Sequence, residues 1–64
     1  MLVNGQPIYL EQEISLAEFL EAQHFEINRV AVELNGMIIP KAAYTHTFLK
    51  DTDQLEVVCF VGGG

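Results

Sequence analysis

The sequence has little cysteine, few basic residues and no long hydrophobic run. Its single cysteine, Cys59, excludes an internal disulfide and fits a reducing compartment. Three basic residues against nine acidic ones give a net charge of −6. This charge opposes binding to nucleic acid and to anionic lipid, and it favours a basic partner surface. No apolar run approaches the ~18 residues of a membrane span.

The chain is also short and lacks the features of a secretory signal. Its 64 residues are enough for one compact domain but leave little room for an enclosed active site. Residues 1–5 show neither a basic region nor an apolar stretch, so we expect a cytoplasmic protein. Any chemistry is therefore expected at an edge or an end of the domain.

A hairpin and a helix are predicted in the first half of the chain. Asn4-Gly5 lies between residues 2–4 and 7–10, which predicts two strands joined by a tight turn, with Pro7 at a strand start or unpaired edge. Ser15 and Glu18 have the spacing of a reciprocal capping box, which begins a helix that ends near residues 23–24. Three apolar side chains share one face of this helix: Leu16, Phe19 and Leu20.

The second half of the chain predicts a second hairpin and a final strand. Residues 30–34 alternate between apolar and polar, and Asn35-Gly36 turns the chain into a strand at 37–39. Residues 41–47 form a connecting segment with a helical turn, and residues 54–61 form the last strand. The order of elements is the β-grasp (ubiquitin-like) pattern. We therefore expect an α+β fold, a mixed sheet of about five strands with one main helix on one face.

The glycine end is the sharpest feature of the sequence. Gly62, Gly63 and Gly64 add no packing and would lose much conformational entropy if ordered, so they cannot serve to stabilise the fold. We expect a β-grasp domain over residues 1–61 and a flexible tail over 62–64. Extended chain from Val61 to Gly64 can carry the Gly64 carboxylate about 13 Å from the domain. The alternative interpretation is a frayed terminus without function.

Val58, Phe60 and Val61 form a predicted partner-docking surface beside the tail. Alternation along the last strand directs Val58 and Phe60 away from the helix-covered face. The alternative is a second apolar cluster, for which the candidate partners are Leu2, Ile8 and Ile39.

No catalytic or metal-binding group is predicted. Alternation directs Leu55, Val57 and Cys59 inward, which indicates a buried and inert thiol. The histidines at 24 and 46 are expected to be solvated, and Asp51-Thr52-Asp53 is typical of a polar turn. We therefore expect no enzyme activity from the chain itself.

The chain resembles the ThiS family of thiamine-biosynthesis sulfur carriers, which belongs to a wider group with the molybdopterin-synthase small subunit and ubiquitin. The resemblance covers essentially the whole chain and is carried by residues 34–36, 39–41, 49–58 and 63–64. Two departures are an extra glycine, Gly62, and Tyr44 where many relatives carry tryptophan.

The resemblance implies a working mechanism at Gly64. A ThiF-type adenylating enzyme would use ATP and magnesium to form an acyl-adenylate at the terminal glycine. A cysteine-derived sulfur donor would then displace AMP and leave a thiocarboxylate, which hands its sulfur to the thiazole synthase ThiG. The carrier would bind no cofactor or metal and supply no catalytic side chain.

Three other functions are compatible with the sequence. The chain could carry sulfur for molybdopterin synthesis or for another thiolation pathway. It could be a non-catalytic β-grasp binding module with an idle tail, or a protein modifier of the ubiquitin kind. Activity that survives loss of Gly64 would favour the binding module.

Overall fold

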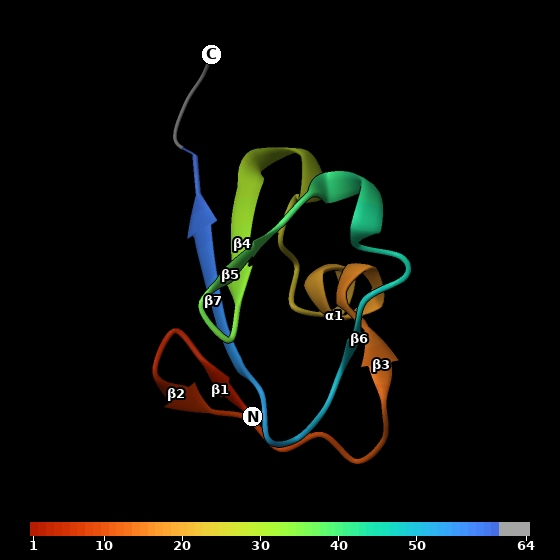
Figure 1. The fold of residues 1–64 in the computed structure, drawn as a ribbon, viewed down its shortest axis with the longest axis vertical. Helices are drawn as coiled ribbons and strands as arrows, with labels where there is room; N and C mark the ends of the chain where they lie inside the picture. Colours follow the sequence, from red (N-terminus) through yellow and green to blue (C-terminus); the bar gives the residue numbers. More distant parts are fainter. Residues whose placement is uncertain (61–64) are drawn as a thin grey trace.

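A five-stranded mixed sheet forms the centre of the computed structural model, which describes residues 1–60 (Figure 1). The strand order is β2-β1-β7-β4-β5, so the last strand in the chain lies in the middle of the sheet. β7 runs parallel to β1, whereas the other neighbours are antiparallel. The strands are β1 (Leu2–Val3), β2 (Gln6–Pro7), β4 (Val30–Leu34), β5 (Met37–Ile39) and β7 (Gln54–Cys59). The predicted mixed sheet is confirmed.

Both Asn-Gly hairpins are present, and their backbone angles explain the residue choice. Asn4 and Gly5 have φ of 52° and 80°, and Asn35 and Gly36 have φ of 51° and 84°. Two consecutive positive φ values are typical of the tight hairpin turn that asparagine and glycine tolerate best. The second strand is shorter than the predicted segment 7–10, and Pro7 lies in the edge strand β2, where a missing amide donor is tolerated.

The capping box begins the helix where the sequence predicts it. In α1 (Leu16–Ala22), the backbone amide of Glu18 donates to Ser15 Oγ at 3.0 Å, and the amide of Ser15 donates to Glu18 Oε1 at 3.3 Å. The helix ends at its cap residue Gln23. Within residues 1–60 no helix is long and apolar enough to cross a membrane.

The hydrophobic core lies between α1 and one face of the sheet (Figure 1). The predicted helix face is buried in it, together with inward side chains of β1, β4 and β7. Burial also raises the pKa of the Tyr44 hydroxyl. The buried apolar residues are Met1, Val3, Leu16, Ala17, Phe19, Leu20, Val30, Val32, Tyr44, Leu49, Leu55 and Val57. The opposite face of the sheet, called the outer face below, is not covered by the helix.

A second, two-stranded sheet was not predicted. β3 (Ile14–Ser15) pairs antiparallel with β6 (Phe48–Leu49) next to α1. Two 3-10 turns complete the described elements: η1 (Ile27–Arg29), and η2 (Lys41–Ala43), which is the helical turn expected in the connection. β6 anchors that connection, because Leu49 is fully buried.

Candidate functional site

The central strand β7 is the element that leads to the glycine tail, and it is held on both sides. Five residue pairs join it to β4, from Val30 opposite Cys59 to Leu34 opposite Leu55. One residue beyond the strand, the amide of Phe60 donates to the Arg29 carbonyl at 2.7 Å. The chain is therefore fixed to the domain as far as Phe60.

The predicted reactive group lies outside the described residues. Val61 and the tail residues Gly62, Gly63 and Gly64 all follow residue 60. What the structure supplies for the site is the strand that precedes them and the surface around its end.

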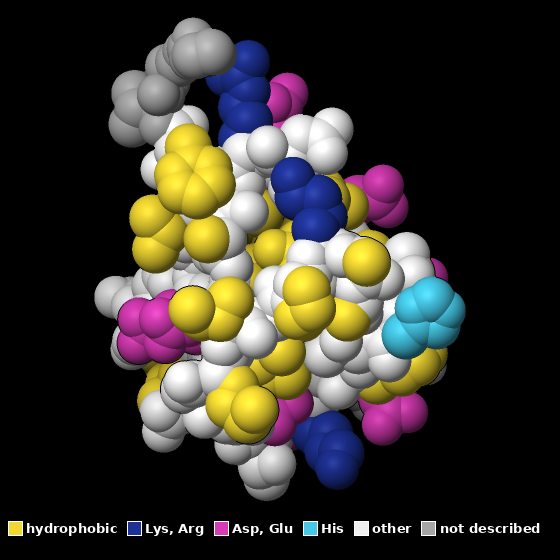
Figure 2. Space-filling view, turned by 45° about the horizontal axis from the view of Figure 1, so that its top comes forward, with side chains coloured by type: hydrophobic (Ala, Val, Ile, Leu, Met, Phe, Trp, Pro, Cys, Tyr) yellow, Lys and Arg dark blue, Asp and Glu magenta, His cyan; other side chains and the backbone are white. Residues whose placement is uncertain are grey.

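The outer face at the end of β7 is apolar and exposed. Val58 and Phe60 are 59% and 60% exposed, as the alternation along the last strand predicts. The alternative cluster is not formed with Ile8 or Ile39, because both pack against the core on the other face. Figure 2 shows hydrophobic side chains gathered over this end of the molecule, with acidic side chains on the same side.

The inward placement of Cys59 did not lead to burial, and this prediction was wrong. Leu55 and Val57 are buried as expected, but Cys59 is an exposed free thiol. Alternation sets the face on which a side chain lies, but burial also requires an element above it. Cys59 is the last residue of β7, at the end that projects beyond α1 (Figure 1).

The outer face also carries a group of residues that sequence reasoning missed. Strand register places Glu33 opposite Glu56, Ile38 opposite Glu33, and Ala31 opposite Val58. The two-residue period of β4 and β7 could have shown that Glu33 and Glu56 both lie on the outer face. It could not have shown that they lie opposite each other, because the period does not give the register between two strands.

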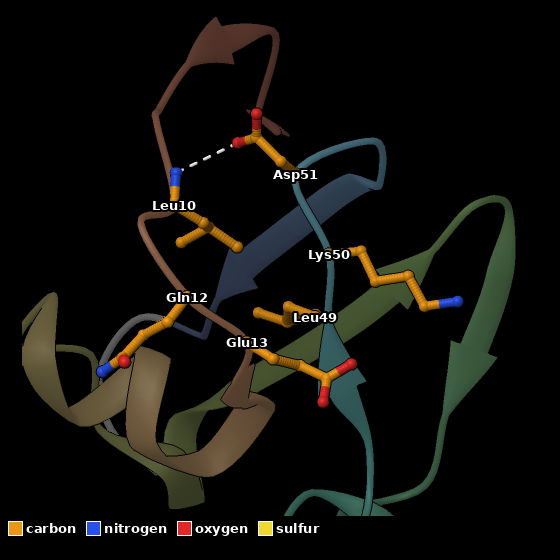
Figure 3. A pocket seen from close by; sticks show the side chains of 6 residues that line it. All are labelled: Leu10, Gln12, Glu13, Leu49, Lys50 and Asp51. Carbon is orange, nitrogen blue, oxygen red and sulfur yellow. Dashed lines mark hydrogen bonds between the residues drawn. The ribbon is translucent and has the colours of Figure 1, made fainter.

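Asp51 ties the start of the chain to the loop before β7. The amino group of Met1 donates to Asp51 Oδ1 at 3.1 Å and to the Ile8 carbonyl at 2.9 Å. The amide of Leu10 donates to the same carboxylate oxygen at 3.0 Å (Figure 3). The Leu10 hydrogen bond, followed by that of the amino group, lowers the pKa of Asp51.

A hollow of about 220 Å³ lies beside Asp51. In Figure 3 the side chains of Leu10 and Leu49 lie between the two chain segments that form it, whereas Lys50 points away. The segments that line it, residues 10–13 and 49–51, lie at the opposite end of the domain from the end of β7 (Figure 1), so we assign the hollow no part in chemistry at the tail. Its remaining lining residues are Gln12 and Glu13.

The two histidines are exposed, as predicted, and lie on separate segments. Within residues 1–60 no group of three or more His, Cys, Asp and Glu side chains has a geometry that could hold a metal ion. The described part of the site is an exposed apolar surface at the end of a fixed strand.

Comparison with protein families gives a match over the whole chain. Residues 1–64 match the model of the ThiS family. The crystal structure of the thiamine biosynthesis protein ThiS from Geobacter metallireducens superposes with a TM-score of 0.84 at 35% identity. The match covers 98% of this chain and 96% of that one.

Three relatives extend the comparison. The sulfur carrier protein ThiS of Bacillus subtilis is 35% identical over 63 residues, 97% of this chain and 96% of that protein. The uncharacterized protein ycf40 of Pyropia yezoensis is 44% identical over 62 residues, 97% of this chain and 87% of that protein. A thiazole synthase of Paramagnetospirillum magneticum is 33% identical over 64 residues, which cover all of this chain and 20% of that protein.

Proposed function

Because this chain belongs to the ThiS family of sulfur carriers in thiamine biosynthesis, we propose that the carboxylate of Gly64 is its working group. A free carboxylate is a poor electrophile because its charge is delocalised and its leaving group is bad. An adenylating partner of the ThiF type, with ATP and magnesium, converts it into an acyl-adenylate and releases pyrophosphate. The carrier itself binds neither cofactor nor metal.

The sulfur enters and leaves at the same carbon. The terminal sulfur of a cysteine-derived persulfide attacks the acyl-adenylate and displaces AMP. A thiol then reduces the resulting acyl disulfide, which releases the donor cysteine and leaves a thiocarboxylate on Gly64. Transfer of that sulfur to the thiazole under construction, with oxygen returned from water, restores the carboxylate. The partner in this second step is a thiazole synthase.

One comparison supports the choice of thiazole synthase. The Paramagnetospirillum magneticum protein of that name contains, within a longer polypeptide, a stretch that matches this whole chain. A carrier and an enzyme that occur in one polypeptide can meet without diffusing together, which is an advantage only if they act in succession.

The observation that carries the proposal is the arrangement around β7. The strand that leads to the glycines is the central one of the sheet, and exposed Val58 and Phe60 lie at its end. We propose that these two residues and Val61 dock the partner while the tail enters its cleft. A cytoplasmic, reducing setting fits the exposed free thiol of Cys59.

The test either deletes Gly64 or converts its carboxylate into a peptide bond. A strain that lacks the native carrier is supplied with the wild type, with a variant lacking Gly64, or with a variant carrying one alanine after Gly64. Only the wild type is expected to restore growth without thiamine. Full rescue by both tail variants would contradict the proposal and favour a binding module.

A further inference from the structure

Two glutamates face each other in the middle of the outer sheet face. Glu33 of β4 lies directly opposite Glu56 of β7, and both side chains are exposed. Side chains at directly opposite positions in an antiparallel pair are close neighbours, and like charges there destabilise the sheet. The free protein therefore carries an unfavourable charge pair on the strand that leads to the tail.

No ion pair within residues 1–60 neutralises these two carboxylates. Two ion pairs occur within residues 1–60: Met1 with Asp51, and Arg29 with Glu26. Neither involves Glu33 or Glu56, and the whole sequence has three basic residues. A cation that compensates the two carboxylates must come from outside.

Apolar side chains lie beside the two carboxylates on the outer face. Ile38, which lies opposite Glu33, is 75% exposed, and Ala31 and Val58 form the next row of the same face. A hollow of about 110 Å³ in this face is lined by both glutamates and by Ile38 and Val58. Apolar side chains around a charged centre are the arrangement in which a partner cation would be most strongly desolvated.

We propose that this face docks onto the adenylating partner through one arginine, which inserts between Glu33 and Glu56 while apolar side chains cover Ile38, Val58 and Phe60. The inference rests on the proposed function for the identity of the partner. An enzyme that binds the triphosphate of ATP needs positive charge around its cleft, and the carrier has a net charge of −6. Arginine suits the site better than lysine because its planar group can bond two carboxylates and is weakly hydrated.

A second copy of the chain does not fit this face. Two copies placed face to face would bring four glutamates together without a cation between them. The charge pattern therefore selects a basic partner over self-association.

Adenylation kinetics test the proposal with a matched control. The carrier is titrated against the purified ThiF-type enzyme in an assay of ATP–pyrophosphate exchange. Changing both glutamates, Glu33→Gln and Glu56→Gln, is expected to raise KM about ten-fold with kcat unchanged. The control is Glu11→Gln with Glu21→Gln, which makes the same change of charge at exposed positions away from this face and should alter KM less than about two-fold.

A second variant distinguishes a loss of docking from a loss of folding. Glu33→Lys places a cation opposite Glu56, so the free protein should unfold at a higher temperature while KM still rises. The double glutamine variant should likewise be at least as stable as the wild type. A higher KM without a lower unfolding temperature shows that the two glutamates act in docking and not in holding the fold.

Three results would overturn the inference. One is an unchanged KM for both outer-face variants; another is an equal rise in KM for the control. The third is a loss of affinity for purified thiazole synthase alone, which would place a different partner on the face. If the wild-type carrier supports no exchange at all, the proposed function fails too, and that outcome is distinct from the other three.

Discussion

The side chain of Asn4 bonds both backbone groups of Val57. The amide of Val57 donates to Asn4 Oδ1 at 2.8 Å, and Asn4 Nδ2 donates to the Val57 carbonyl at 3.2 Å. β1 ends at Val3, so this side chain extends the pairing of β7 beyond the end of its parallel neighbour. The same asparagine holds the first hairpin turn with a φ of 52°.

Replacing this side chain should loosen the strand that leads to the tail. Asn4→Gly keeps the turn conformation but removes both bonds, and we expect a loss of about 1–3 kcal/mol in the free energy of unfolding. Urea denaturation measures it. The matched control is Asn35→Gly, whose side chain bonds Gln54 and Asp53 at an exposed site and should matter less. Equal losses would contradict a special role for Asn4.

The pH dependence of stability should reveal the Asp51 contact. Hydrogen bonds from Leu10 and the amino terminus hold the pKa of Asp51 below its ordinary value. A lowered pKa means that the ionised carboxylate stabilises the fold above its unfolded pKa of about 4, and that this contribution is lost as the pH falls through the folded pKa.

Comparing the wild type with Asp51→Asn isolates this contribution. The stability advantage of the wild type should be constant near neutral pH and shrink below about pH 4. Urea denaturation at a series of pH values measures the difference, with Glu21→Gln as the control for removing a carboxylate from the helix surface. An advantage that does not change with pH would show that the charge is unimportant.

Local signals in the sequence predicted those parts of the fold that residues close together determine. The Asn-Gly turns and the box formed by Ser15 and Glu18 each need only neighbouring residues, and both occur as expected. The pairing of Ile14–Ser15 with Phe48–Leu49 was missed because two-residue strands have no period. Which short strand pairs with which depends on how the whole chain packs.

The candidate site was predictable in part for the same reason. The exposure of Val58 and Phe60 follows from alternation along one strand. The Glu33–Glu56 pair requires the register between two strands, and the exposure of Cys59 requires knowledge of where the helix ends in space. Neither relation is present in a single segment of sequence.

The exposure of Cys59 can be checked by chemical labelling. An accessible thiol should react with Ellman's reagent in native buffer at a rate within about ten-fold of the rate in guanidinium chloride. Cys59→Ser provides the blank. Reaction that occurs only after unfolding would restore the buried interpretation.

The exposed apolar residues at the end of β7 should affect partner binding more than folding. Val58→Ser and Phe60→Ser are expected to change the free energy of unfolding by less than about 0.5 kcal/mol, because both side chains are exposed. KM for the adenylating partner should rise in each. Phe48→Ser is the matched control, since Phe48 is similarly exposed but lies on β6. An equal rise in KM for the control would remove the case for a docking surface.

The most direct test of the central claim is the intact mass of the carrier. It is measured before and after incubation with the adenylating enzyme, ATP, magnesium and a sulfur source. A thiocarboxylate at Gly64 adds about 16 Da, because one oxygen is exchanged for sulfur, and the gain should be absent without ATP and in the variant that lacks Gly64. A wild-type mass that stays unchanged, or a gain that persists without Gly64, would contradict the account.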